Sequence, residues 1–168
     1  MFKCVPSHFS AIACLSASIL IFGLGCKSLQ TDVYQEGLTT ADGEPAYITV
    51  QHCLISFEGI PNVSSLRTRE EAEALANDLF EKAKAGEDFD KIVKKHTDDS
   101  APGIYRMANY GQKSDMNSIV PSKQIHPRNG MVPAFGNTGF PLEVGEYGLA
   151  EHDPRNSPYG WHIVKRLK

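Results

Sequence analysis

The chain has 168 residues, enough for one ordinary domain together with a targeting segment. Charged residues make up 22% of it, which excludes a wholly membrane-embedded protein, and hydrophobic residues make up 41%, which excludes a mainly disordered one. The formal net charge of −3 gives no electrostatic basis for binding nucleic acid, so no nucleic-acid partner is expected.

The N-terminal segment has the composition of an export signal. Lys3 is the only charged residue before Cys26, and residues 11–25 (AIACLSASILIFGLG) are nearly all small or apolar. This run is shorter than the roughly 20 residues of a membrane-spanning helix. It is typical of a secretory signal peptide, which we place at residues 1–25. The alternative is an anchor helix that stays attached to the protein.

The apolar run ends in Gly-Leu-Gly-Cys-Lys-Ser. A cysteine that follows a small residue at this point resembles the signal of bacterial lipoproteins, although the first glycine stands where that family usually has leucine. The resemblance implies that Cys26 carries lipid, and more than one acyl chain is needed for stable anchoring. Cys4 and Cys14 then leave with the signal, and Cys53 remains as a small buried apolar side chain without a disulfide partner.

The polar segment that follows is interpreted as a flexible tether. Residues 26–45 carry scattered Gly and Asp and show no apolar period. Residues 46–57 (AYITVQHCLISF) are rich in β-branched and aromatic side chains, which predicts the first strand of a domain spanning residues 46–168. Alternation along this strand places His52 and Leu54 on the same face.

Two helices are predicted next, each with a recognisable start. Thr68 and Glu71 have the spacing of a capping box, and an apolar stripe at helical spacing follows them. Gly86 is a natural C-terminal stop for this helix. Asp88 can cap a second, shorter helix, and residues 97–103 (TDDSAPG) have the composition of a loop.

The last third of the chain mixes loop, helix and strand signals. Residues 111–130 contain prolines and asparagines with little periodicity, which predicts a long surface loop. A short helix is predicted over residues 133–142, with Pro133 at its first position. Residues 146–152 and 161–167 predict two strands. Strands before and after several helices indicate an α+β fold with an antiparallel sheet.

Three blocks of sequence, in order, resemble the parvulin family of peptidyl-prolyl isomerases, also called PpiC-like rotamases. They are VQHCLISF, then GEDFDKIVKKHTDDSA, then GMVPAFGNTGFPLEVGEYG followed by YGWHIVKRL. The resemblance runs from about Ile48 to Lys168. It implies a four-stranded antiparallel sheet surrounded by about four helices, and catalysis of cis/trans isomerisation at X–Pro bonds.

The reaction itself limits what the site needs. Amide resonance opposes rotation with a barrier of about 18–20 kcal/mol, and no bond is made or broken. A non-covalent site without nucleophile, metal or cofactor is therefore expected, provided that it binds the twisted amide better than the planar one. An apolar cup for the proline ring and polar groups near the carbonyl would meet this need.

The resemblance assigns the apolar cup to Met131 and Phe135, with Met107 as a third wall. Methionine is adaptable and phenylalanine is flat, which suits a saturated ring. The alternative is that these side chains belong to the core. The family's Gly-Gly-x-Leu-Gly segment is replaced here by GIYRMANYG at residues 103–111, so the segment that would supply the third wall differs from that of the family.

The resemblance assigns the polar side of the site to His52, His162, Asp99 and Ser157. The two histidines fall on neighbouring inner strands and can share one proton. Ser157 falls where the family often has a hydroxyl that holds one of them, and Asp99 falls at the family's Cys-or-Asp position near the rotating carbonyl. The choice of Asp99 over Asp98 rests on register alone, and a structural role is the alternative for each histidine.

Two further expectations concern ligands. The remaining histidines lack the spacing of metal ligands to one another or to a cysteine, so no metal site is expected. Phosphate-directed parvulins carry a basic cluster after the first strand, whereas residues 58–66 contain none and Arg67 and Arg69 come only at the end of this loop. We therefore predict no requirement for phosphoserine or phosphothreonine before the proline.

The leading hypothesis is a monomeric, lipid-anchored isomerase that helps exported or envelope proteins fold. Its partners would be unfolded or extended Pro-containing polypeptides, and its only membrane contact would be the lipid on the periplasmic side. A binding module that holds Pro-containing segments with little turnover is the main alternative. An envelope structural lipoprotein is a third possibility, but the preserved residues of the cup argue against it.

Overall fold

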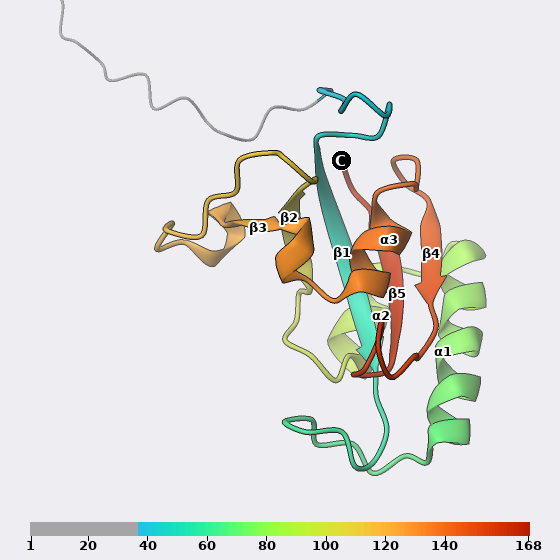
Figure 1. Cartoon of the computed structure of the whole chain (residues 1–168). Helices are drawn as coiled ribbons and strands as arrows, with labels where there is room; N and C mark the ends of the chain where they lie inside the picture. Colours follow the sequence, from blue (N-terminus) through green and yellow to red (C-terminus); the bar gives the residue numbers. More distant parts are fainter. Residues whose placement is uncertain (1–36) are drawn as a thin grey trace, which may run out of the picture. The chain divides into compact units, whose positions relative to one another are not determined.

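The computed structural model describes residues 37–168, so the predicted signal peptide and Cys26 lie outside the described residues. Its centre is a single sheet with strand order β3-β2-β1-β5-β4, with helices against both faces (Figure 1). No helix in this part of the chain is both long and apolar enough to cross a membrane. The strands are β1 (Tyr47–Ile55), β2 (Ile104–Ala108), β3 (Ile125–Pro127), β4 (Tyr147–Ala150) and β5 (Trp161–Arg166), and the helices are α1 (Arg69–Lys84), α2 (Phe89–His96) and α3 (Pro133–Gly139).

The α+β class is confirmed, whereas the expected strand and helix numbers are corrected. Residues 37–168 form a five-stranded mixed sheet with three α-helices and two short 3-10 helices, Pro121–Lys123 and Arg128–Gly130. The extra strand, β3, pairs in parallel with β2 and lies within the segment that was predicted to be all loop. Three residues are too few to show the alternation from which strands are predicted.

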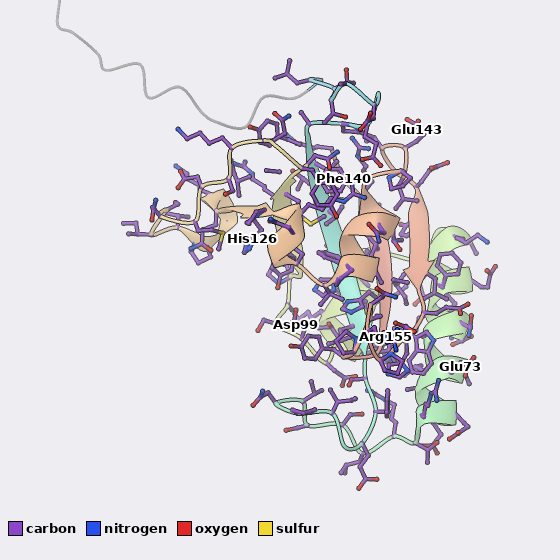
Figure 2. The ribbon with its side chains drawn as sticks, in the orientation of Figure 1. Glu73, Asp99, His126, Phe140, Glu143 and Arg155 are labelled. Atoms are coloured by element: carbon purple, nitrogen blue, oxygen red, sulfur yellow. The ribbon has the colours of Figure 1, made fainter. Side chains whose placement is uncertain are left out.

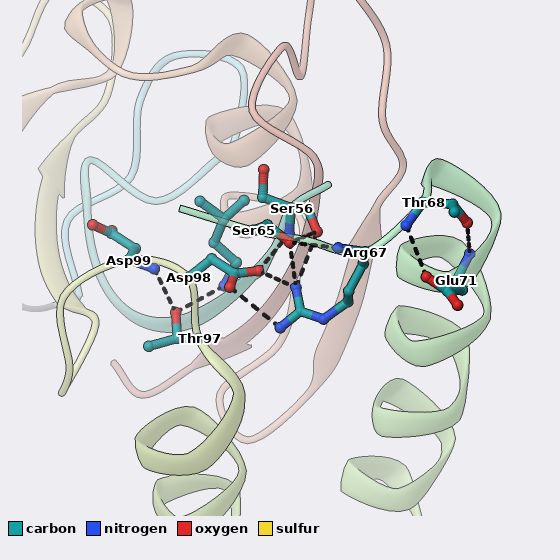
Figure 3. Close-up of polar contacts among 9 residues, drawn as sticks. Ser56, Ser65, Arg67, Thr68, Glu71, Thr97, Asp98 and Asp99 are labelled. Carbon is teal, nitrogen blue, oxygen red and sulfur yellow. Dashed lines mark hydrogen bonds and ion pairs between the residues drawn. The ribbon is translucent and has the colours of Figure 1, made fainter. Parts of the chain in front are cut away.

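The predicted helix starts are confirmed by their hydrogen bonds. The Thr68 amide donates to a Glu71 carboxylate oxygen at 2.8 Å, and the Glu71 amide donates to the Thr68 hydroxyl at 3.2 Å, so the capping box is complete (Figure 3). Asp88 caps α2 by accepting from the amide of Asp90 at 3.1 Å. Gly86 follows α1 with a φ of 96°, a left-handed conformation that favours glycine.

The sheet is buried on both faces because β1 and β5 are apolar on both. One face carries Cys53 and Ile163 against α1 and α2. The other carries Val50 and Val164 against α3, with Phe140 fully buried between them. His52 and His162 stand on this second face, so the strand alternation that builds the core also directs both imidazoles toward α3.

Part of the predicted tether belongs to the folded domain. Residues 37–45 form a turn in which the Thr40 amide donates to the Glu44 carbonyl at 2.7 Å. The Glu44 carboxylate binds the Arg128 guanidinium at 2.7 Å, and Arg128 stacks on the Phe140 ring at 4.5 Å. This chain of contacts ties the turn to the end of α3, so the domain begins by residue 37.

Candidate active site

The predicted polar and apolar residues meet at one cavity of about 300 Å³ beside the middle of the sheet. It lies between the C-terminal half of β1, the start of α3, and the loops before α1 and β2. Its walls are formed by His52, Leu54, Pro61, Asn62, Val63, Asp98, Asp99, Tyr105, Met131, Val132, Phe135, Tyr159 and His162. The size is at the lower end for sites that hold small ligands or short peptide segments.

Two histidines and a carboxylate form a hydrogen-bonded chain along one wall. Nδ1 of His52 lies 3.3 Å from Nδ1 of His162, and Nε2 of His52 lies 3.0 Å from Oδ2 of Asp99. The pairing of β1 with β5 places the two imidazoles on one face, nearly parallel at 19°. The structure thus brings together three of the residues that the resemblance assigns to the site, His52, His162 and Asp99.

Charge determines which nitrogens carry protons. The hydrogen bond from His52 lowers the pKa of Asp99 to about 2, so its carboxylate is ionised and accepts the proton on Nε2 of His52. Burial, helped by the proximity of His52, lowers the pKa of His162 to about 3, so that imidazole is neutral. The neutral His162 has a single ring N–H, and its Nδ1 lies within hydrogen-bond distance of Nδ1 of His52. Nε2 of His162 is buried and has no hydrogen-bond partner among the described residues.

Tyr105 is a site residue that the sequence did not single out. Its hydroxyl donates to Oδ2 of Asp99 at 3.1 Å, so this oxygen accepts from both Tyr105 and His52. Burial and the neighbouring carboxylate raise the pKa of Tyr105 to about 12 and keep the hydroxyl protonated. Its ring packs edge-on against His126 of β3 at 5.4 Å, and Figure 2 shows Asp99 and His126 on the same side of α3. The inserted strand thus supports the site.

Met131 and Phe135, two of the residues predicted for the apolar cup, line the cavity, whereas Met107 does not and Tyr105 takes its place. Met107 is fully buried in the core and does not line the cavity. Tyr105 and Met107 both face α3 from β2. The register places Tyr105 opposite Val50, nearer to His52, and Met107 opposite Ile48. The Phe135 ring completes the wall, 4.9 Å from the imidazole of His52.

Ser157 does not hold a histidine. Its hydroxyl is fully buried and donates to the Gly160 carbonyl at 2.7 Å, within the turn between β4 and β5. Gly160 has a φ of 136°, and a Cβ there would lie 2.3 Å from the carbonyl oxygen of Ile55. The side chain therefore stabilises the turn that leads into β5, which differs from the predicted contact with an imidazole.

The two neighbouring aspartates have separate partners. Asp98 binds Arg67 in a bidentate ion pair at 2.5 and 3.2 Å and also accepts from the Ser56 amide at 2.7 Å (Figure 3). The hydroxyl of Thr97 accepts from the amides of Leu54 and Asp99, which fixes this turn to the end of β1. The turn places Asp99 beside His52 and directs Asp98 toward Arg67, and both carboxylates line the cavity.

Within residues 37–168 no group of three His, Cys, Asp or Glu side chains is arranged to hold a metal ion. Cys53 is fully buried, and burial raises the pKa of its thiol to about 12, so it is unreactive. The cavity combines an apolar cup with the carboxylate of Asp99, which two hydrogen bonds hold in one orientation.

Comparison with known families agrees with this geometry. Residues 37–168 match the family described as the PPIC-type PPIASE domain, and the match begins at the same turn that the structure includes in the domain. The chain belongs to this family of parvulin-type peptidyl-prolyl isomerases. The enzyme class predicted from the three sequence blocks is therefore confirmed at the level of the family.

Curated relatives of the domain are larger proteins. Chaperone SurA of Pseudomonas fluorescens (strain Pf-5) is 31% identical over 120 residues, which cover 71% of this chain and 22% of the relative. A parvulin-like PPIase of Rickettsia bellii is 28% identical over 113 residues, which cover 67% of this chain and 34% of the relative. The chain thus spans between a fifth and about a third of the length of these relatives.

Solved structures show the same fold at low identity. Peptidyl-prolyl isomerase ESS1 from Candida albicans aligns with a TM-score of 0.53 at 20% identity, over 78% of this chain and 66% of that one. The solution structure of TbPIN1 aligns with a TM-score of 0.53 at 18% identity, over 73% of this chain and 98% of that one. These likenesses establish a parvulin-like fold.

Proposed function

We propose that the domain catalyses cis/trans isomerisation of X–Pro bonds in extended polypeptides, without a covalent intermediate. The observation that carries the proposal is the junction of cup and carboxylate in one cavity. Met131, Phe135 and the Tyr105 ring surround a space suited to proline, and Asp99 stands beside it. A proline ring seated in the cup brings the carbonyl of the preceding residue toward Asp99.

The carboxylate favours rotation through the charge of the substrate carbonyl. In the planar amide, resonance places partial negative charge on the carbonyl oxygen, and twisting removes part of that charge. An ionised Asp99 near this oxygen repels the planar form more than the twisted one, which lowers the barrier. His52 and Tyr105 hold the carboxylate oriented and ionised, and the neutral His162 holds His52.

A phosphate before the proline is not part of the proposed substrate. Arg67, at the end of the loop where phosphate-directed relatives carry a basic cluster, has its guanidinium bound to Asp98, to Ser65 and to the Ser56 carbonyl. A phosphorylated residue would have to displace these bonds to reach the cation. We expect plain Ser–Pro peptides to be isomerised at least as fast as their phosphorylated forms, and a strong preference for phosphopeptides would contradict this.

The cellular role is proposed from the N-terminal sequence. The segment at residues 1–25 and the lipid-accepting Cys26 support an exported, monomeric isomerase that is held at the periplasmic side of a membrane by acyl chains. Its clients would be exported or envelope proteins whose folding is limited by slow X–Pro isomerisation. The relatives named chaperone SurA favour the same general role in folding.

A second candidate is a binding module that holds Pro-containing segments with little turnover. The replacement of the family's Gly-Gly-x-Leu-Gly segment at residues 103–111 favours it, because the Tyr105 ring lines the cavity and its hydroxyl is bonded to Asp99. The two candidates share the cavity and differ only in whether the bound amide rotates faster.

Exchange NMR on a short Ala–Pro peptide separates the candidates. We expect the full chain to accelerate exchange and Asp99→Asn to reduce the acceleration about tenfold or more, because it removes the charge and keeps the shape. Asp78→Asn is the matched control, since Asp78 forms an exposed ion pair with Lys82 on α1. Peptide binding without acceleration by the unaltered protein would favour the binding module.

A further inference from the structure

The ion pair between Asp98 and Arg67 lies at one wall of the cavity, which Asp98 lines and Arg67 does not. Both carboxylate oxygens of Asp98 contact the guanidinium, and only 12% of the Asp98 side chain is exposed. Arg67 also bonds the Ser65 hydroxyl at 3.1 Å and the Ser56 carbonyl at 3.0 Å, so the guanidinium is held at several points (Figure 3). The pair closes the base of the loop that contributes Pro61 and Val63 to the cavity.

The charges at the cavity follow from this pairing. Asp98 and Asp99 both line it, and Arg67 neutralises only the first of them. Asp99 bonds the imidazole of His52 and the hydroxyl of Tyr105, and no Lys or Arg side chain lines the cavity. The wall that would face the residue before a bound proline therefore carries two carboxylates, and the nearby guanidinium of Arg67 is already paired with one of them.

We propose that Asp98 is a specificity-determining residue: by occupying the Arg67 guanidinium, it makes the cavity discriminate against an acidic residue immediately before the proline. The inference rests on the proposed isomerase function and assigns it a preference. A proline ring in the cup of Met131 and Phe135 leaves the Asp98 side of the cavity for the preceding side chain. There the carboxylate of an acidic substrate residue is repelled by Asp99. The Arg67 guanidinium does not offset this repulsion, because it is already paired with Asp98.

A charge series on the pair tests the proposal. The readout is the ratio of kcat/KM for a Glu–Pro peptide to that for the isosteric Gln–Pro peptide, measured by exchange NMR. We expect the unaltered protein to give a ratio below 1. Asp98→Asn frees the cation and should raise the ratio about fivefold, the effect of one unit charge at about 8 Å in a partly solvated site. Arg67→Met leaves two carboxylates and should lower the ratio by a similar factor.

The double variant distinguishes charge from structure. Arg67→Met combined with Asp98→Asn restores the original net charge, so its ratio should return to within about twofold of the unaltered protein. A purely structural pair would instead reduce activity on both peptides together and leave the ratio unchanged in every variant. Asp78→Asn, which removes an exposed carboxylate on α1 that does not line the cavity, should leave both activity and ratio unaltered.

The failures of the two proposals are distinguishable. If the unaltered protein accelerates neither peptide, the isomerase function falls. If it accelerates both and the ratio stays constant across the series, only the role of Asp98 is overturned. Should a variant fail to fold, salt titration of the unaltered protein provides a second test. The discrimination against Glu–Pro should weaken as ionic strength rises, because exposed charges are screened, and a salt-independent ratio would overturn the proposal.

Discussion

Acidification should destabilise the protein through His162. Burial lowers the pKa of this imidazole from 6.5 to about 3, and its Nε2 has no partner among the described residues. Below its unfolded pKa the unfolded chain binds a proton that the folded chain does not, so stability present above that pH is lost as pH falls toward the folded pKa. At about 1.4 kcal/mol per pKa unit, the loss between neutral pH and about pH 4 comes to roughly 3 kcal/mol.

Urea unfolding of the unaltered protein and His162→Gln across this pH range measures the loss. Glutamine keeps a polar amide side chain at this position but does not titrate. Other histidines whose pKa is lowered by burial, such as His126 and His152, contribute equally to both proteins, so the difference isolates His162. The depressed pKa of Asp99 acts at lower pH, from about 4 to about 2. Equal pH slopes for the two proteins would refute the buried, neutral imidazole.

Three substitutions test other parts of the structure. Tyr105→Phe keeps the ring but removes a hydrogen bond to Asp99, so the pKa of Asp99 should rise in carboxyl-carbon NMR and kcat/KM should fall about three- to tenfold; unchanged values would remove the hydroxyl from the site. Thr68→Ala should lower the free energy of unfolding by about 1 kcal/mol in urea without changing isomerase activity, and a loss of activity would contradict its purely local role. Gly160→Ala should cost about 2 kcal/mol or more, because the new Cβ would lie 2.3 Å from the Ile55 carbonyl oxygen, and a neutral result would contradict this turn geometry.

The sequence predicts best where a local pattern decides the structure. The capping box of Thr68 and Glu71 determines where α1 begins, because the hydrogen bonds involved join residues only three apart. The apolar alternation of β1 places His52 on the face that carries the site, and the same parity places His162 there on β5. These elements need no knowledge of distant contacts, so they could be predicted from local patterns, whereas the site roles of His52 and His162 come from the resemblance to the parvulin family.

Local sequence patterns leave two features open: which residue of β2 lines the cavity, and whether residues 125–127 form a strand. Tyr105 and Met107 are two residues apart and share a face, so parity cannot say which one reaches the cavity. The pairing of β2 with β1 decides it, with Met107 opposite Ile48 and further from His52. The three residues of β3 are likewise too few for a pattern, and they form a strand only because the edge of β2 is available.

The central claim is that the cup beside Asp99 seats the proline whose bond rotates. The most direct measurement compares Met131→Ala, which opens the cup, with Met116→Ala, an exposed methionine at the inserted segment, by exchange NMR on an Ala–Pro peptide. We expect Met131→Ala to lose about tenfold or more in kcat/KM while it stays folded, and Met116→Ala to match the unaltered protein. Full activity in a folded Met131→Ala would contradict the claim and place the reaction elsewhere.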